Sequence, residues 1–139
     1  MAAGTLVDAN VLLDVLTEDP AWLDWSQDAL ATAADTGPLW INPLIYAEVS
    51  VRFTAIEDLE DALPSDHFSR APLPWEAAFL AGKAFVAYRR RGGHKSAVLP
   101  DFYIGAHAAV AGLSLLTRDA ARYRTYFPTV ALRAPGRRR

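Results

Sequence analysis

Four acidic residues stand where they could act together in chemistry: Asp8, Glu48, Asp101 and Asp119. Asp8 closes a short apolar run over residues 5–8, and Asp119 closely follows a second run over 114–117. Both runs are predicted strands, and the carboxyl ends of parallel strands lie on the same rim of a sheet. An Asp after one strand is often only a turn residue. The same feature after two strands favours a shared site.

Glu48 lies within an apolar helical stripe, because Leu44 is four residues before it, Ile45 three before it and Val51 three after it. A buried carboxylate is costly unless it is paired or binds a cation. An ion pair with Arg52, four residues on, explains the position equally well. Both interpretations remain open from the sequence.

Asp101 follows Pro100 in the first turn of a predicted helix, where an acid also favours the helix dipole. Its face continues through three small or apolar residues, Ile104, Gly105 and Ala108. Such a face predicts close packing, so Asp101 is expected to point inward at the edge of the core.

Four converging carboxylates would need a positive counter-charge. Two carboxylates about 5 Å apart repel by roughly 3 kcal/mol at an effective dielectric constant of about 20. A site with oxygen ligands alone favours Mg²⁺ or Mn²⁺ over zinc, and such a site suits phosphodiester hydrolysis. The chain has 16 acidic and 14 basic residues, so removing four acids leaves 12 and a slightly basic remaining surface.

The elements that must position these acids alternate between strands and helices. Further strands are predicted over residues 39–41 and 129–132, and Asn10 is expected to cap the first helix. Later helices are predicted over 22–34, 43–55, 57–63, 75–91 and 101–111, with a loop over 69–74. Strands that alternate with helices predict an α/β fold with a mainly parallel sheet.

The composition fits one domain of 139 residues, expected to span 1–134 with a flexible basic tail at 135–139. The absence of cysteine suits the cytoplasm. No signal peptide is expected from the first residues, MAAGTLVDAN. The longest uncharged run, 102–117, is too short for a membrane span.

Four segments carry a resemblance that covers nearly the whole chain: TLVDANVLLDVL, YAEV, PDFYIGAHA and LLTRDAARYRTYF. Together they resemble PIN domains, and more closely the VapC toxins of bacterial toxin–antitoxin pairs. The resemblance implies a three-layer α/β/α sandwich and a Mg²⁺- or Mn²⁺-dependent endoribonuclease that cuts structured RNA such as tRNA or rRNA.

The resemblance also implies roles for the acidic residues. Asp8 and Asp101 would hold the metal directly, and Glu48 and Asp119 would complete the site through water or a second ion. Two polar residues, Asn10 and Thr117, would support the site through hydrogen bonds.

The family further implies a VapB-type antitoxin partner and a homodimer, or a toxin–antitoxin hetero-oligomer. A basic cluster is a hypothesised contact for RNA phosphates: Arg89, Arg90, Arg91 and Lys95. His94 and His107 are not expected to be catalytic, with a structural or surface role for His107. The four tryptophans are expected in the core or at an interface.

Three other interpretations are compatible with parts of the pattern. A haloacid-dehalogenase-type phosphatase also begins with an Asp at a strand end, but it needs a second Asp where this chain has Asn10. A PIN-like module without activity would not be expected to keep all four acids. A PIN nuclease of RNA processing, without an antitoxin, differs in its partners and not in its chemistry.

Overall fold

The structure is a computed structural model that describes residues 4–94 and 98–136. Lys95 and the last three arginines, predicted to contact RNA or to form a tail, lie outside the described residues.

Five short strands form one parallel sheet in the order β3-β2-β1-β4-β5. The strands are β1 (Thr5–Val7), β2 (Leu39–Ile41), β3 (Phe68–Arg70), β4 (Ser114–Leu116) and β5 (Leu132–Arg133). β1 lies in the centre, with Leu6 paired to Trp40 on one side and to Leu115 on the other. The predicted parallel α/β fold is confirmed.

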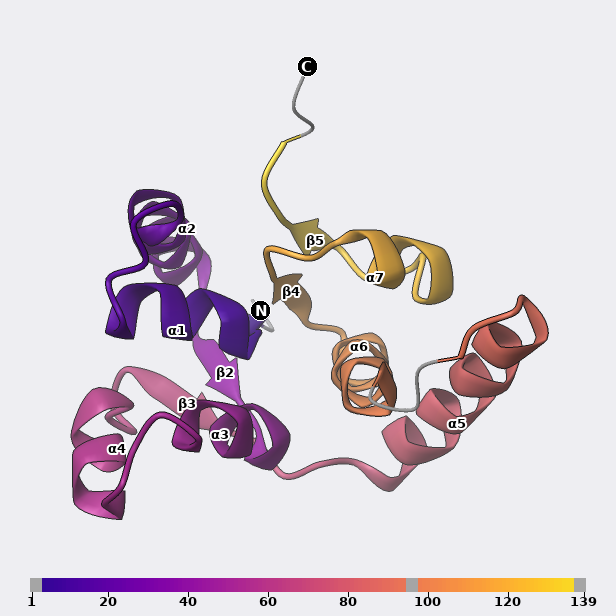
Figure 1. Cartoon of the computed structure of the whole chain (residues 1–139), viewed down its shortest axis with the longest axis horizontal. Coiled ribbons are helices and arrows are strands. Elements are labelled where there is room, and N and C mark those ends of the chain that lie inside the picture. The colour runs from indigo at the N-terminus through magenta and orange to yellow at the C-terminus, as the bar shows by residue number, and fades with distance from the viewer. Residues whose placement is uncertain (1–3, 95–97, 137–139) are drawn as a thin grey trace.

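Seven helices surround the sheet in the described part of the chain: α1 (Ala9–Leu16), α2 (Leu23–Thr36), α3 (Pro43–Ser50), α4 (Ile56–Ala62), α5 (Trp75–Arg90), α6 (Leu99–Ala111) and α7 (Ala121–Tyr126). Figure 1 shows α1 and α2 on one face of the sheet and α3 and α6 on the other. α6 lies between the sheet and α5, so α5 is the outermost helix on its side. This arrangement is the α/β/α sandwich that the family resemblance implies.

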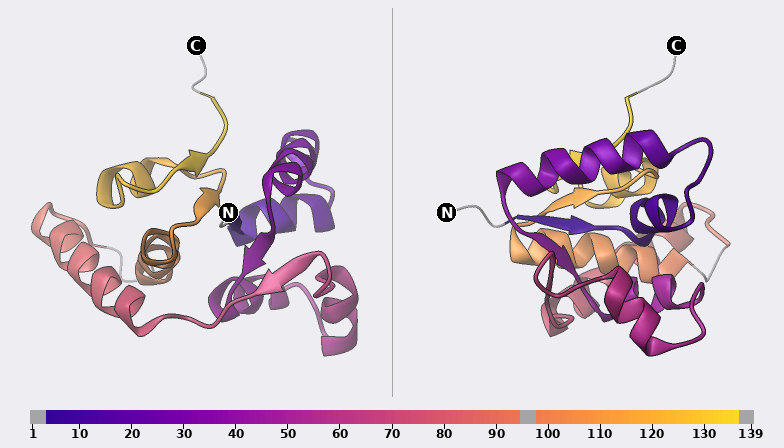
Figure 2. Two further views of the ribbon diagram at one scale, coloured as in Figure 1. Left: turned by 180° about the vertical axis from the view of Figure 1, so that it is seen from behind. Right: turned by 90° about the vertical axis from the view of Figure 1, so that its left-hand side faces the viewer.

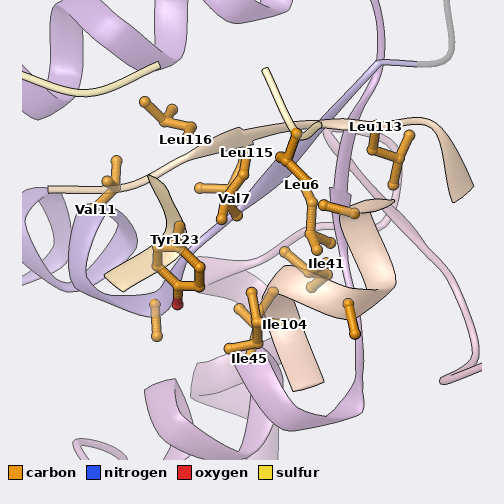
Figure 3. Packing of buried hydrophobic residues seen from close by; sticks show 14 of the residues in the cluster. Leu6, Val7, Val11, Ile41, Ile45, Ile104, Leu113, Leu115, Leu116 and Tyr123 are labelled. Atoms are coloured by element: carbon orange, nitrogen blue, oxygen red, sulfur yellow. The ribbon is translucent and has the colours of Figure 1, made fainter. Parts of the chain in front are cut away.

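The core lies between the sheet and these helix layers. Leu6, Leu115 and Leu116 are fully buried, as expected for strands that helices cover on both faces. Figure 3 shows Ile45 of α3 and Ile104 of α6 close together beside the strands. Burying each such side chain stabilises the fold by roughly 1.5–3 kcal/mol.

The start of the first helix differs from the prediction. Asp8, and not Asn10, is the N-cap residue, with extended backbone angles and a carboxylate that accepts a hydrogen bond from the Ala9 amide. α1 therefore begins directly after β1, as the right-hand view of Figure 2 shows. The Asp8 amide donates a hydrogen bond to the Leu116 carbonyl of β4 at 2.9 Å, so Asp8 lies at the end of the sheet.

Other parts of the fold also depart from the prediction. α3 ends at Ser50 and not near residue 55, since the amides of Arg52 and Phe53 bond to carbonyls three residues back and the chain turns there. Residues 68–70, partly within the predicted loop, form the edge strand β3 through backbone pairing with β2. α7 was not expected, and the last strand is Leu132–Arg133 instead of 129–132.

Among the described residues, no helix is long and apolar enough to cross a membrane.

Candidate active site

A pocket of about 460 Å³ opens at the carboxyl ends of β1 and β4. The strand order reverses between these two strands, which is where open parallel sheets form their sites. All four acids singled out in the sequence line it, although they come from four separate parts of the chain. The lining comprises Asp8, Ala9, Asn10, Leu13, Glu48, Val51, Arg52, Asp101, Asp119 and Tyr123.

Asp8 is the deepest of the four acids, with only 6% of its surface exposed. It accepts hydrogen bonds from the Ala9 amide at 2.8 Å, the Thr117 hydroxyl at 2.9 Å and the Tyr123 hydroxyl at 3.3 Å. All three donors are neutral. Burial, with a smaller contribution from the charge of Asp101, raises the pKa of Asp8 to about 6 despite these hydrogen bonds.

The Thr117 hydroxyl ties three site residues together. It donates to Asp8 and accepts from the Asp119 backbone amide at 3.1 Å and from the Asn10 side chain at 3.4 Å. One donor and two acceptors are all that a hydroxyl offers. Asn10 in turn accepts a hydrogen bond from the backbone amide of Arg118 at 3.3 Å. Thr117 and Asn10 thus connect the end of β1 to the loop after β4.

Glu48 reaches the pocket from α3, and its Oε1 atom is buried without a hydrogen-bond partner. Within the described ranges it forms no ion pair with Arg52, so the alternative considered from the sequence is wrong. Burial first, and then the charges of Asp8 and Asp101, raise the pKa of Glu48 to about 7. A carboxylate in this state is stabilised by any cation that enters the pocket.

Asp101 projects from the first turn of α6 and pairs with Arg122 of α7, with 2.8 Å between Oδ2 and Nη1. Burial raises the pKa of Asp101, and the nearby Arg122 opposes that shift only in part. The absence of a side chain at Gly105 lets α7 and the Phe127 that follows it lie close against α6, since a Cβ atom there would come within 2.5 Å of the Phe127 ring. The small-residue face predicted for this helix is therefore the contact that holds Arg122 near Asp101.

Asp119 is the exposed member of the set and lies in the loop after β4. Its charge contributes to the raised pKa of Asp101, so the two acids are electrostatically coupled across the pocket. Tyr123 closes the inner side, and Figure 3 shows its ring among the core side chains. Burial, and then the charge of Asp8, raise the pKa of the Tyr123 phenol, which keeps it protonated as a donor to Asp8.

A divalent cation fits this donor set by chemistry. The candidate ligands are all oxygens, one of them is a buried carboxylate atom without a partner, and burial disfavours their charged forms. In the described part of the chain, however, no three acidic or histidine side chains are already grouped as a metal site. The ion pair with Arg122 engages Asp101 in this arrangement.

Other predicted residues lie away from the pocket. Arg89 and Arg90 are exposed at the end of α5, while Arg91 lies over the Tyr126 ring at 5.4 Å. His107 is buried, so a surface role is excluded, and its Nδ1 atom accepts a hydrogen bond from the Asn42 side chain at 2.9 Å.

Sequence reasoning missed Arg122 and Tyr123 as parts of the site. Both lie on α7, three and four residues after Asp119, a spacing that could have indicated them had a helix been expected there. Arg52 was considered only as a partner for Glu48, yet it lines the pocket.

Comparisons with known proteins agree with this architecture. A chain in the crystal structure of VapBC2 from Rickettsia felis, bound to a DNA fragment from their promoter, is similar with a TM-score of 0.73 and 15% identity, covering 95% of this chain and 98% of that one. VapBC-1 from nontypeable Haemophilus influenzae gives a TM-score of 0.70 and 14% identity, with 94% and 96% covered. A toxin–antitoxin complex from Klebsiella pneumoniae gives 0.65 and 23%, with 92% and 96% covered.

These identities are low, and the likeness to the solved structures establishes the fold. No curated protein sequence matches the chain. The family model of the PIN domain matches residues 5–128, which is most of the chain and includes all four acids. The chain belongs to the PIN domain family.

Proposed function

We propose that this protein is a Mg²⁺- or Mn²⁺-dependent endoribonuclease that acts as the toxin of a toxin–antitoxin pair. The observation that carries the nuclease is the convergence of Asp8, Glu48, Asp101 and Asp119 on one pocket, with a buried Glu48 oxygen that has no partner. PIN domains are generally nucleases and generally use divalent metals. The fold and the pocket therefore favour the same chemistry.

Each acid has a proposed part in that chemistry. Asp8 and Asp101 would hold the metal directly, while Glu48 and Asp119 would act through water or a second ion. A bound Mg²⁺ or Mn²⁺ would neutralise charge on the phosphate oxygens and lower the pKa of the attacking water.

Uncharged side chains position the acids of this pocket through hydrogen bonds. Thr117 and Tyr123 hold one oxygen of Asp8, Oδ2, at the pocket floor. Asn10 and Thr117 fix the loop that carries Asp119. Glu48 Oε1 remains available to accept a hydrogen bond from an entering water molecule.

RNA phosphates would meet basic residues around this pocket. Arg52 is exposed at its mouth, which makes it a direct candidate for a phosphate contact. Of the basic cluster proposed for RNA, Arg91 lies against α7, the helix that carries Tyr123 of the pocket. Structured RNA such as tRNA or rRNA, in the cytoplasm, is the proposed substrate.

The proposed partners are a VapB-type antitoxin and a second copy of this chain. Support comes from the similar structures, which are VapBC and toxin–antitoxin complexes. This chain spans nearly the whole length of the chains that it matches there. Inhibition of RNA cleavage by the product of a short neighbouring gene would support the toxin assignment.

Cleavage of total RNA by antitoxin-free protein, with and without Mg²⁺ or Mn²⁺, tests the proposal. Asp8→Asn should abolish metal-dependent cutting. Asp35→Asn, which removes an exposed acid on α2, should leave cutting unchanged. Cleavage that persists in Asp8→Asn would contradict the site. If folded wild-type protein cuts neither tRNA nor rRNA, a non-catalytic binding module would be favoured.

A further inference from the structure

Asn42 and His107 form a buried polar contact outside the pocket. Each residue is only 2% exposed, and the amide nitrogen of the Asn42 side chain lies 2.9 Å from Nδ1 of His107. Neither residue is among those that line the pocket. The chemistry proposed for the four acids therefore does not use this pair directly.

The helix cap fixes the direction of this hydrogen bond. Asn42 is the N-cap of α3, and its Oδ1 atom accepts a hydrogen bond from the Ile45 amide at 2.9 Å. A backbone amide can only donate, so the other end of the Asn42 side chain is its NH₂ group. That group donates to Nδ1 of His107, which is therefore unprotonated, with the ring proton on Nε2. Burial lowers the pKa of His107, which keeps the ring neutral and preserves this acceptor.

The contact belongs to a row of three residue pairs between α3 and α6, which lie on the same face of the sheet (Figure 1). The members follow one another at intervals of three residues, in opposite directions along the two helices: Asn42 with His107, Ile45 with Ile104, and Glu48 with Asp101. Residues three apart are neighbours on a helix surface. Ile45 and Ile104 lie close together in Figure 3, and the charge of Asp101 acts on Glu48. The row therefore runs from a hydrogen bond, through an apolar contact, to two acids of the pocket.

The apolar pair alone would leave the register of α3 and α6 loosely defined. Contact between Ile45 and Ile104 is not directional, so it tolerates a small slide or rotation of one helix against the other. A hydrogen bond has a narrow range of distances and angles. A buried polar contact with its partners satisfied also favours a single arrangement of the core. The bond between Asn42 and His107 thus defines how the two helices meet.

The acids at the other end of the row repel each other. Glu48 lies six residues after Asn42, which is roughly 9 Å along the helix axis. α3 has only eight residues, so a bond at its first turn orients the whole helix. A displacement of Asn42 against α6 would therefore also move the Glu48 carboxylate relative to Asp101.

We infer that Asn42 and His107 are positioning residues, whose hydrogen bond holds Glu48 and Asp101 at the separation that a divalent cation requires. They do not touch the cation, and they act by fixing α3 against α6. The inference rests on the proposed metal-dependent function, and it extends the site to two residues outside the pocket.

Mn²⁺ binding to the metal-free protein, followed by the electron paramagnetic resonance signal of free Mn²⁺, tests the inference without a measurement of catalysis. His107→Leu removes the acceptor and should weaken binding by about 3- to 30-fold, the range for residues that act on a site through packing. His107→Asn should recover most of the affinity, because its Oδ1 is bonded to Cγ, as Nδ1 is in histidine, and can accept the same hydrogen bond. The smaller side chain leaves a cavity and should lower the melting temperature, so greater stability cannot explain that recovery.

A second variant tests whether the two residues act through one contact. Serine also caps helices, so Asn42→Ser keeps the start of α3 but loses the donor to His107, and it should weaken Mn²⁺ binding as His107→Leu does. The double variant should bind no more weakly than either single variant, because a shared contact is lost only once. Tyr103→Phe is the matched control: it removes a hydrogen bond from the same helix to the Pro74 carbonyl, before α5, and should leave the affinity unchanged.

Several outcomes would overturn the inference and leave the proposed nuclease in place. They are variants that bind Mn²⁺ as tightly as wild type, His107→Asn that binds as weakly as His107→Leu, additive losses in the double variant, and equal weakening by Tyr103→Phe. A proton on Nδ1 of His107 in ¹H–¹⁵N correlation spectra would also overturn it. A wild type that binds no Mn²⁺ would instead overturn the proposed function, and the inference with it. Circular dichroism reports the folding of each variant, and if His107→Leu is unfolded, Asn42→Ser compared with wild type decides the question.

Discussion

Asp8 and Asp14 are two buried carboxylates at either end of the same short helix, and their surroundings are opposite in kind. Asp14 is 2% exposed and receives two hydrogen bonds from Arg118, at 2.7 and 3.0 Å, together with one from Ser26 at 2.7 Å. Asp8 is buried almost as deeply, at 6%, yet all of its donors are neutral.

The difference separates a structural acid from a site acid. Asp14 has its counter-charge inside the protein, since the guanidinium of Arg118 joins α1 to the loop after β4. Asp8 faces a pocket that it shares with three other carboxylates, and burial first, then the charge of Asp101, raise its pKa. Burial alone therefore does not distinguish these two acids; the presence or absence of a cationic partner does.

The largest effect on stability is expected at Asp14. Asp14→Asn leaves Arg118 without its carboxylate and should lower the free energy of unfolding by about 3 kcal/mol, the lower end for a broken buried pair because Arg118 is partly exposed. Urea denaturation measures it. Asp24→Asn, an exposed change on α2, should stay within about 0.5 kcal/mol. If the two variants have the same free energy of unfolding, the ion pair of Asp14 does not stabilise the fold, and Asp14 does not differ from Asp8 in this respect.

Asp8→Asn should behave in the opposite way. It should lower metal-dependent RNA cleavage by more than about 100-fold, since ligand changes exceed the 10–100-fold typical of residues behind the ligands. At pH 8 the metal-free variant should nevertheless melt at a higher temperature than wild type, because it no longer carries a buried charge. A lower melting temperature would show that the Asp8 charge stabilises the fold.

The pH dependence of stability should also show that Asp8 and Glu48 are buried without a cationic partner. The pKa values of Asp8 and Glu48 are raised from 3.8 and 4.5 to about 6 and about 7, so the folded state binds these protons more tightly than the unfolded state. The resulting stabilisation is complete below about pH 4 and is lost as the pH rises through 6 to 7. The free energy of unfolding in a chelator should fall by about 2 kcal/mol from pH 5 to pH 8, with the share of half-buried Glu48 reduced for solvent screening.

A double variant is the control for this dependence. Asp8→Asn combined with Glu48→Gln should flatten the profile between pH 5 and pH 8, since neither replacement titrates. A wild-type profile that is flat in the same range would contradict the raised pKa values.

The smallest effect is expected at Arg122. Its guanidinium is a partial counter-charge for Asp101, as Arg118 is the counter-charge for Asp14. Arg122→Ala should raise the affinity for Mn²⁺ by a factor of about 2 to 5, because a competing, partly exposed cation worth at most about 1 kcal/mol is removed. Calorimetric titration of Mn²⁺ measures it. Arg124→Ala, an exposed change on the same helix, should leave the affinity unchanged. Weaker binding in Arg122→Ala would show that Arg122 positions Asp101 for the metal.

The sequence allowed prediction of those features that local patterns encode. The ends of β1 and β4 placed Asp8 and Asp119 on one rim, and the apolar stripe of α3 placed Glu48 inside. α7 escaped prediction because it has six residues, no side-chain cap and a position set by packing of Phe127 and Tyr123 on Gly105. β3 escaped for a similar reason, since Phe-Ser-Arg has no apolar run and is defined by its pairing with β2.

The ion-pair partners of the acids in this chain could not be derived from helix spacing. Arg52 stands four residues after Glu48, yet the two form no ion pair in the described chain, and α3 has already ended between them. The partners that matter, Arg118 for Asp14 and Arg122 for Asp101, are 104 and 21 residues away. Long-range packing decides such contacts.

The hydrogen bonds that Asp8 accepts from Thr117 and Tyr123 can form only late during synthesis of the chain. Asp8 and Thr117 are 109 residues apart, and Asp8 and Tyr123 are 115 apart. At the usual 5–20 residues per second, a ribosome needs roughly 5 to 20 s to add the chain between Asp8 and Thr117. Throughout that interval the first acid of the pocket lacks its last two anchoring partners. The pocket therefore cannot be assembled on the growing chain until Tyr123 has been added.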